Sequence, residues 1–209
     1  MGNNSIVLRG KRWTKFLVNM INEKLHGLDF SMVYVGDLQR NTLDYHGYNM
    51  TDAGDMERML KAVPIDVKKS AFLDVGCGKG MVMKCAKESG YGKVSGLDLD
   101  KHLLDIARNN MEKLKLDVDC IYANAAEFKK YADFDVFYFY NPFGESILKQ
   151  VIEKIKESQT IRNRDIYILY YHPVYNEILL DAGFVLENEL QDRTRDYRTE
   201  YFFYSKQNR

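Results

Sequence analysis

Residues 72–80 read FLDVGCGKG, and this stretch decides the fold class. An apolar run over 71–75 predicts a short buried strand, which breaks at three alternate glycines: Gly76, Gly78 and Gly80. Glycine lets the backbone turn tightly and leaves no side chain between it and a ligand. The helical pattern that follows would direct its free N–H groups into the same space. Asp74, just before the turn, is placed to accept a hydrogen bond from a cationic or hydroxyl-bearing ligand.

A second acid supports a nucleotide-binding reading of this turn. Asp98 ends the next strand-like run, 93–99, and precedes a helix with a regular apolar stripe. An acid at the end of the second strand of a βαβ unit is placed to bind the two ribose hydroxyls of a nucleoside. The glycine spacing here is G-x-G-x-G, whereas the dinucleotide fingerprint is G-x-G-x-x-G. The difference favours S-adenosylmethionine over NAD as the ligand.

Strand and helix patterns alternate along most of the chain. Apolar runs occur at 71–75, 93–99, 118–123, 134–140 and 165–171, and helical patterns occur between and after them at 80–89, 101–115, 144–157 and 174–182. This alternation predicts an α/β fold with a mostly parallel, doubly wound sheet. Two further strands at the C-terminus, 184–189 and 199–205, flank a charged turn and predict a hairpin.

The two acid-bearing segments, FLDVGCGKG and GLD at 96–98, resemble the first two motifs of the class I (Rossmann-like) S-adenosylmethionine-dependent methyltransferases. A Rossmann dehydrogenase is the alternative. The resemblance implies a three-layer, mostly parallel sheet with an antiparallel C-terminal hairpin. It also implies S-adenosylmethionine as cofactor, and contacts to it from Asp74, Gly76, Gly78, Gly80, Asp98 and Leu99.

The N-terminal third has a different pattern. Seven apolar residues recur at helical spacing: Trp13, Phe16, Leu17, Met20, Ile21, Leu25 and Leu28. A second helix, capped by Thr51 or Asp52 and ended by Pro64, has Met56, Met59, Leu60 and Val63 on its buried face. We expect residues 1–66 to form a helical cap or extension and residues 67–209 to form the cofactor-binding domain, in one compact unit.

Composition narrows the functional class. Lys plus Arg equals Asp plus Glu, 30 each, so no global field attracts nucleic acid or a membrane. The three cysteines have no metal-ligand spacing, and we expect no metal and reduced thiols, Cys77 and Cys85 being packed. No apolar run approaches the roughly 20 residues of a spanning helix, and the N-terminus shows no signal-peptide pattern. We therefore expect a cytoplasmic protein without membrane insertion.

The third strand end supplies Asn124, where the resembled family usually places an acid along the adenine edge. Its amide is a candidate contact for the adenine amino group, with the backbone of Ala125 beside it. A cap for a helix over 125–131 is an equal alternative. Upstream, Tyr48 and Thr51 lie where the family folds a segment over the cofactor, and they are candidates for its methionine carboxylate.

The fourth strand ends in Asn141-Pro142-Phe143. An amide held by proline and followed by an aromatic offers an acceptor, two donors and a flat wall. The segment resembles the D/N-P-P-Y/F motif of amino-group methyltransferases acting on adenine and glutamine, and the Asn-Asn-Phe of non-SET histone-lysine methyltransferases, but it has one proline and lacks the second Asn. Asn141 and Phe143 are predicted at the methyl site, with Asn141 also near the cofactor. A simple strand-to-helix turn is the alternative.

The fifth strand ends in Tyr-Tyr-His-Pro-Val at 170–174. With the N-P-F turn, it resembles a bacterial group of class I methyltransferase-like proteins, some associated with surface-polysaccharide synthesis, over roughly residues 43–205. His172 is a candidate for accepting a proton from a hydroxyl during transfer, and a structural histidine is the alternative.

Methyl transfer from a sulfonium is an in-line displacement in which the protein mainly aligns the reactants and excludes water. We therefore predict an S-adenosylmethionine-dependent methyltransferase acting on a small molecule or glycan. The alternatives are a protein or nucleic-acid amino-group methyltransferase and a non-catalytic cofactor-binding module. Duplex nucleic acid is not expected as a substrate, because GESILKQ after the N-P-F turn is not basic. The sequence leaves the oligomeric state open.

Overall fold

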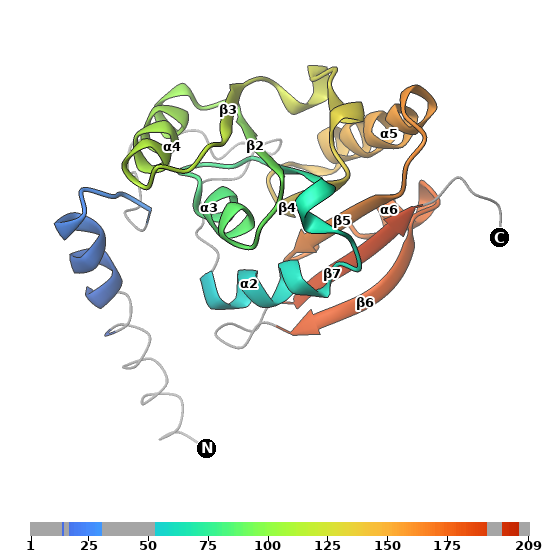
Figure 1. Ribbon diagram of the computed structural model, residues 1–209. Helices are drawn as coiled ribbons and strands as arrows, with labels where there is room; N and C mark the ends of the chain where they lie inside the picture. Colours follow the sequence, from blue (N-terminus) through green and yellow to red (C-terminus); the bar gives the residue numbers. More distant parts are fainter. Residues whose placement is uncertain (1–13, 15–16, 31–52, 192–197, 205–209) are drawn as a thin grey trace.

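The computed structural model describes residues 14, 17–30, 53–191 and 198–204. Its centre is a seven-stranded sheet of order β3-β2-β1-β4-β5-β7-β6 (Figure 1). The strands are β1 (Ala71–Val75), β2 (Lys93–Asp98), β3 (Asp119–Tyr122), β4 (Val136–Tyr140), β5 (Ile166–Tyr171), β6 (Val185–Gln191) and β7 (Arg198–Tyr204). β1 to β5 pair in parallel, and β7 runs antiparallel between β5 and β6. The predicted parallel sheet with an antiparallel C-terminal hairpin is confirmed.

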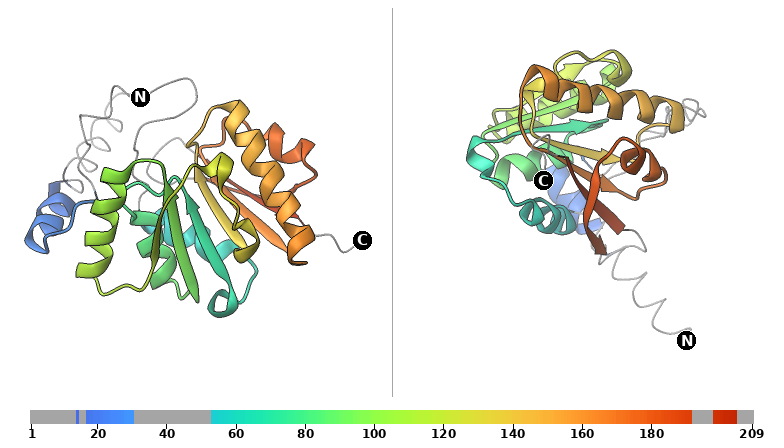
Figure 2. Two further views of the ribbon diagram at one scale, coloured as in Figure 1. Left: turned by 90° about the horizontal axis from the view of Figure 1, so that it is seen from above. Right: turned by 90° about the vertical axis from the view of Figure 1, so that its right-hand side faces the viewer.

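Helices cover both faces of the sheet. The elements are α2 (Ala53–Ala62), α3 (Met81–Glu88), α4 (Lys101–Lys113), α5 (Glu145–Ile161) and α6 (Glu177–Asp181), with 3-10 turns η2 (Val67–Lys69), η3 (Ala125–Glu127) and η4 (Tyr131–Asp133). Residues 17–25 are also helical. Helices lie on both sides of the sheet (Figure 2). α2, α3 and α4 contribute side chains to the core cluster on one face, and η3, η4, α5 and α6 contribute to the cluster on the other. The three-layer arrangement is therefore confirmed.

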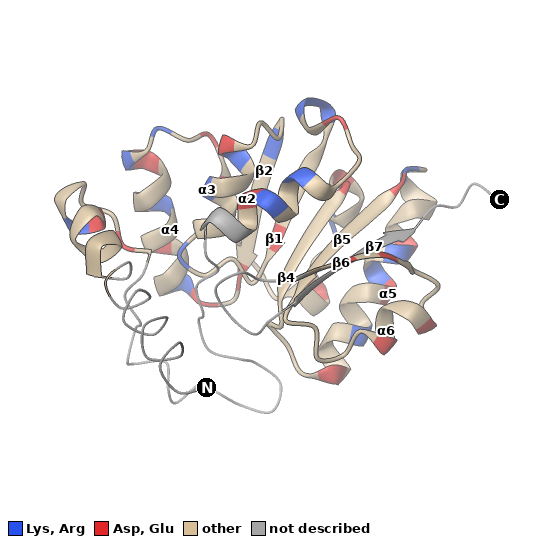
Figure 3. Ribbon diagram, turned by 90° about the horizontal axis from the view of Figure 1, so that it is seen from below, with Lys and Arg blue, Asp and Glu red and all other residues tan. Residues whose placement is uncertain are grey.

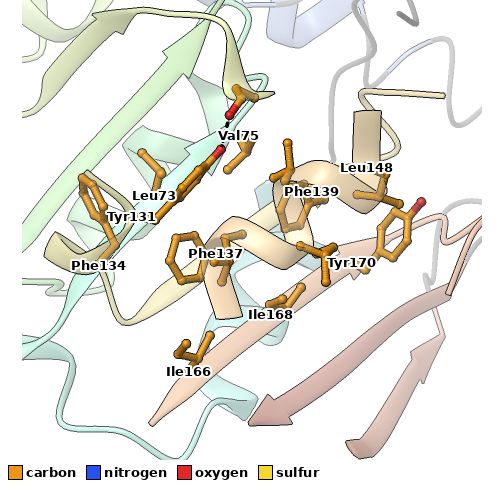
Figure 4. Packing of buried hydrophobic residues seen from close by; sticks show 14 of the residues in the cluster. Leu73, Val75, Tyr131, Phe134, Phe137, Phe139, Leu148, Ile166, Ile168 and Tyr170 are labelled. Atoms are coloured by element: carbon orange, nitrogen blue, oxygen red, sulfur yellow. Dashed lines mark hydrogen bonds between the residues drawn. The ribbon is translucent and has the colours of Figure 1, made fainter. Parts of the chain in front are cut away.

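Alternation along the strands sorts the core into two clusters. Leu73 and Val75 of β1 lie with Phe137 and Phe139 of β4 in the cluster that α5 covers (Figure 4). Phe72 faces the other way, toward α2 and α3. α2 buries Met56, Met59 and Leu60 in that second cluster, as its spacing predicts. The division of the chain at residue 66 stays a prediction.

The segment after β3 departs from the prediction. A helix over 125–131 is replaced by the two short turns η3 and η4. The backbone leaves helical geometry at Phe128, which has φ −63° and ψ 133°. This conformation buries the Phe128 ring edge-to-face on Tyr131, with centroids 5.0 Å apart. Packing of these aromatics outweighs the local preference for a continuous helix.

The amino ends of the strands are joined by a charged network around Asp135. Its carboxylate accepts the Ala71 N–H at 2.9 Å and pairs with Arg162 at 2.7 Å. Arg164, whose side chain is only 6% exposed, lies 3.8 Å from the same carboxylate. Arg164 also donates to the carbonyls of Phe134, Tyr131 and Arg162 at 2.6, 2.9 and 3.2 Å. Burial, with the neighbouring Arg162, lowers the pKa of Arg164 to about 10, so it remains charged at neutral pH.

Candidate functional site

The glycine turn after β1 adopts conformations that side chains disfavour. Gly76, Gly78 and Gly80 have φ of 84°, 51° and 87°. The N–H groups of Gly76 and Cys77 both donate to the Leu97 carbonyl, at 2.8 and 3.0 Å, and so bind the turn to β2 rather than facing a ligand. The next N–H groups, at 81–83, open α3, whose first main-chain bond runs from Lys84 to Gly80. These donors have no intrahelical acceptor and are suited to an anionic or polar ligand group.

Asp98 at the end of β2 is held by the turn itself. Its two carboxylate oxygens accept the N–H groups of Gly78 and Asp100, each at 2.8 Å. Burial raises the pKa of Asp98, and these two hydrogen bonds oppose the rise. Each oxygen keeps a further lone pair. The carboxylate is therefore fixed in position and retains acceptor capacity for two hydroxyl groups.

Asp74 is the more deeply buried of the two acids in the site. It is 2% exposed, and no hydrogen bond to its carboxylate is found within the described residues. Burial, and then the charge of Asp98, raises its pKa well above the ordinary value. A buried carboxyl without a partner is expensive unless a ligand supplies one. An ammonium or hydroxyl group bound beside it would do so.

The ends of β4 and β5 form a matched pair of strained residues. Asn141 and His172 both have left-handed backbones, with φ of 41° and 52°. They are neighbours, because Tyr140 and Tyr171, the residues before them, are paired in register. Tyr170 donates its hydroxyl to the Asn141 side-chain oxygen at 3.2 Å. Non-glycine residues in this region cost about 1–3 kcal/mol and concentrate at functional sites.

The N-P-F turn packs directly on the glycine turn. A side chain added at Gly76 would come within 2.9 Å of the Pro142 Cβ. The two motifs are separate in the sequence, and the structure brings them into contact. Phe143 is 6% exposed and belongs to the cluster beneath α5. Its predicted role as a wall of the methyl site stays a prediction.

The other predicted contacts lie around the end of β3. Asn124 accepts the Ala126 N–H at 3.0 Å and so caps η3. Ala125 is buried, and its carbonyl accepts the Tyr131 hydroxyl at 2.8 Å (the dashed line in Figure 4). Leu99, beside Asp98, is 43% exposed. Tyr48 and Thr51 lie outside the described residues.

Sequence reasoning missed a polar cluster behind the glycine turn. Lys79 is 1% exposed and lies 2.7 Å from Asp29, and Asn110 is fully buried between them. One signal was available. Asn110 stands seven residues after Leu103, in the apolar stripe of α4, and a polar residue in such a stripe needs buried partners.

Within the described part of the chain, metal-ligating side chains do not gather in groups of three or more, and each helix is too short or too polar to span a membrane. Cys77, Cys85 and Cys120 form no disulfide with one another, and Cys77 and Cys85 are buried as predicted.

The chain is similar to known methyltransferases. Residues 72–158 match the family model described as a methyltransferase domain. Ribosomal protein L11 methyltransferase of Burkholderia mallei is 44% identical over 46 residues, which are 22% of this chain and 15% of that protein. The chain thus spans well under two thirds of this curated relative.

Solved structures extend the similarity to the whole sheet. A methyltransferase from Pyrococcus furiosus superposes with a TM-score of 0.63 at 20% identity, covering 93% of this chain and 98% of the other. An RNA methyltransferase from Salinibacter ruber, in complex with S-adenosyl-L-homocysteine, gives 0.58 at 15% identity, covering 77% and 97%. At these identities the likeness shows a shared fold.

Proposed function

We propose that this chain, which has the Rossmann-like fold of the class I methyltransferases and carries a methyltransferase domain over residues 72–158, is an S-adenosylmethionine-dependent methyltransferase. One observation carries the proposal: the strained N-P-F turn packs on a glycine turn flanked by the buried Asp74 and the half-buried Asp98. Cofactor-binding and acceptor-positioning groups thus meet at one end of the sheet, where open α/β folds bind ligands.

The residues present fit the cofactor. Asp98 retains acceptor capacity for two ribose hydroxyls, and the buried, raised-pKa carboxyl of Asp74 suits the methionine ammonium. The glycines let the turn at 76–80 adopt its left-handed backbone, and Gly76 and Gly80 leave room for Pro142 and Met111. Leu99 and the segment at Asn124 and Ala125 would border the adenine. Tyr48 and Thr51 remain proposed contacts for the carboxylate.

The bound cofactor supplies an electrophilic methyl group. The chain's part is to hold the acceptor in line and to exclude water. Asn141 is anchored by Tyr170 at the β4 end, and its amide would orient the acceptor. His172, its neighbour on β5, would take the proton of an acceptor that arrives protonated. A transfer of this kind needs no further acid–base pair.

A small molecule or glycan is the acceptor class that we propose. Supporting it, basic and acidic residues are interspersed over the helices rather than gathered by sign (Figure 3). The N-P-F turn also resembles that of a bacterial group in which some proteins are associated with surface-polysaccharide synthesis. The competing class is a protein or nucleic-acid amino group, which the names of the L11 and RNA methyltransferase relatives favour.

Titration calorimetry tests the proposal directly. The chain should bind S-adenosylmethionine and S-adenosylhomocysteine and should not bind NAD. Methyl release to hydroxyl-bearing glycans and small molecules is then compared with release to protein and RNA. Transfer to RNA with a steep salt dependence would replace the acceptor class that we favour. Binding of NAD alone would overturn the function.

A further inference from the structure

Lys79 is a cation buried inside the glycine turn. Its side chain is 2% exposed, and its Nζ donates to Asp29 Oδ1 at 2.7 Å. The two residues are 50 positions apart in the sequence. Burying an ammonium is costly unless a counter-charge and hydrogen bonds accompany it. The N-terminal segment therefore supplies a charge that the glycine turn requires.

Asn110 of α4 joins the same two partners through their backbones. Its side-chain oxygen accepts the Asp29 N–H at 2.9 Å. Its side-chain nitrogen donates to the carbonyls of Asp29, at 2.9 Å, and of Lys79, at 3.1 Å. One fully buried amide thus links the N-terminal segment to the glycine turn with both of its polar ends engaged.

Neighbouring contacts fix both sides of this link. Lys113 of α4 donates to the Gly27 carbonyl, and Phe30 is 1% exposed. On the turn side, a side chain at Gly80 would come within 3.1 Å of Met111 of α4. We call Asp29, Lys79 and Asn110 together the anchor. It joins residues 27–30, α4 and the glycine turn into one packed unit.

The anchor lies one residue from the contact that orients Asp98. Gly78, next to Lys79, gives its N–H to the Asp98 carboxylate. A shift of the Lys79 backbone would move this donor and the carboxylate with it. We propose that the anchor is part of the cofactor site: Asp29, Lys79 and Asn110 are positioning residues that hold the turn in its binding geometry. This proposal rests on the proposed function.

Thermodynamic linkage gives the proposal a second consequence. If docking of the N-terminal segment raises affinity for the cofactor, the cofactor must strengthen that docking by the same factor. The Asp29 amide, bonded to Asn110, reports the docking through its rate of hydrogen exchange. A purely structural anchor would show no such response.

The test measures S-adenosylhomocysteine affinity by calorimetry in the full chain. Asp29→Asn and Lys79→Met should each weaken binding about 3- to 30-fold, the scale of coupling through packed networks. The double variant should bind S-adenosylhomocysteine no more weakly than the single variant with the lower affinity, because both changes remove the same ion pair. Lys84→Met is the matched control, since it breaks an equally short pair, with Glu88, on α3. It should leave the affinity unchanged.

Hydrogen exchange completes the experiment. Saturating S-adenosylhomocysteine should slow exchange at Asp29 in the wild-type chain and not in Lys79→Met. Variants that melt earlier but keep wild-type affinity per folded molecule would overturn the anchor's role and leave the proposed function standing. A wild-type chain that binds no S-adenosylhomocysteine would overturn the proposed function, and the anchor's role with it.

Discussion

The two ends of the parallel sheet treat their acids in opposite ways. At the amino end, Asp135 pairs with Arg162 and lies beside Arg164. At the carboxyl end, no cation pairs with Asp74 or Asp98 among the residues that the structure describes. The nearby Lys79 is paired with Asp29 instead. Charge at the first end joins elements of the fold. At the second end the acids have no cationic partner among the described residues, which destabilises the folded chain and, under the proposed function, leaves them available to a ligand.

The largest effect is expected at the amino end. Arg164→Met removes a buried guanidinium that bonds three carbonyls, so the free energy of unfolding should fall by about 3–5 kcal/mol. Chemical denaturation measures this. S-adenosylhomocysteine affinity per folded molecule should be unchanged. Arg162→Met, at a side chain 44% exposed, should cost about 1 kcal/mol or less. Equal losses of unfolding free energy in the two variants would contradict the view that Arg164 is the buried, stabilising arginine of this network.

The next effect concerns turnover at the carboxyl end. Asn141→Ala should reduce turnover about 10- to 1000-fold, because a positioned polar group is lost. The melting temperature should hardly change, since the half-buried side chain lies at a strand end. Tyr170→Phe, which removes only the hydroxyl bonded to Asn141, should have a smaller effect of the same kind. A destabilised Asn141→Ala protein with full activity would retire the catalytic role.

Cofactor affinity should depend on Asp98. Asp98→Ala should weaken S-adenosylhomocysteine binding at least about tenfold, because charge-assisted hydrogen bonds contribute roughly 1.5–3 kcal/mol each. Calorimetry measures the change. Asp105→Ala, which breaks an exposed pair with Arg108 on α4, is the control and should bind normally. Unchanged affinity in Asp98→Ala would remove this residue from the site.

The smallest expected effect is an increase in stability, whereas most mutations of core residues lower it. The raised pKa of Asp74 means that its charged form destabilises the folded chain above the ordinary carboxyl pKa, near 4. Asp74→Asn should therefore raise the melting temperature of the ligand-free chain at neutral pH by roughly 2–4 °C, as about 1 kcal/mol would. The gain should vanish as the pH falls below about 4, where the acid is protonated in both states.

In the same variant, ligand affinity should fall while the stability of the ligand-free chain rises. Asp74→Asn should bind S-adenosylmethionine more weakly than the wild type, because the amide lacks the charge that attracts an ammonium. Thermal melts with and without the ligand measure both effects together. A variant that gains no stability at any pH would show that the carboxylate has a partner, and the comparison of the two sheet ends would fail.

Sequence patterns identified the strands of the parallel sheet better than the ends of those strands. The span of β1 was predicted to the residue, because all five of its side chains are buried. β3, at the edge of the described sheet, and β4, at its centre, are each two residues shorter than their predicted runs. α5 extends to Ile161, beyond its predicted end at 157, because the polar Ser158 and Gln159 are buried.

Local sequence patterns predicted part of the site and missed its long-range contacts. Asp74 and Asp98 were predictable because each lies near the carboxyl end of a strand at the motif spacing. The link from Asp29 to Asn110 was not, since it joins residues 81 positions apart and no local pattern encodes it. A lysine in a turn is ordinarily exposed, and the sequence around Lys79 carries no sign of the Asp29 partner that allows it to be buried.

The contact of Pro142 with Gly76 also limits how this sequence can be recombined. Pro142 and Gly76 lie 66 positions apart, yet their turns pack so closely that a larger residue at position 76 would collide with the proline. A chimera that takes one turn from a relative with a bulkier residue at position 76 would inherit a collision with the proline. Shuffling of related genes is therefore expected to preserve function only where the crossovers carry both turns from the same parent.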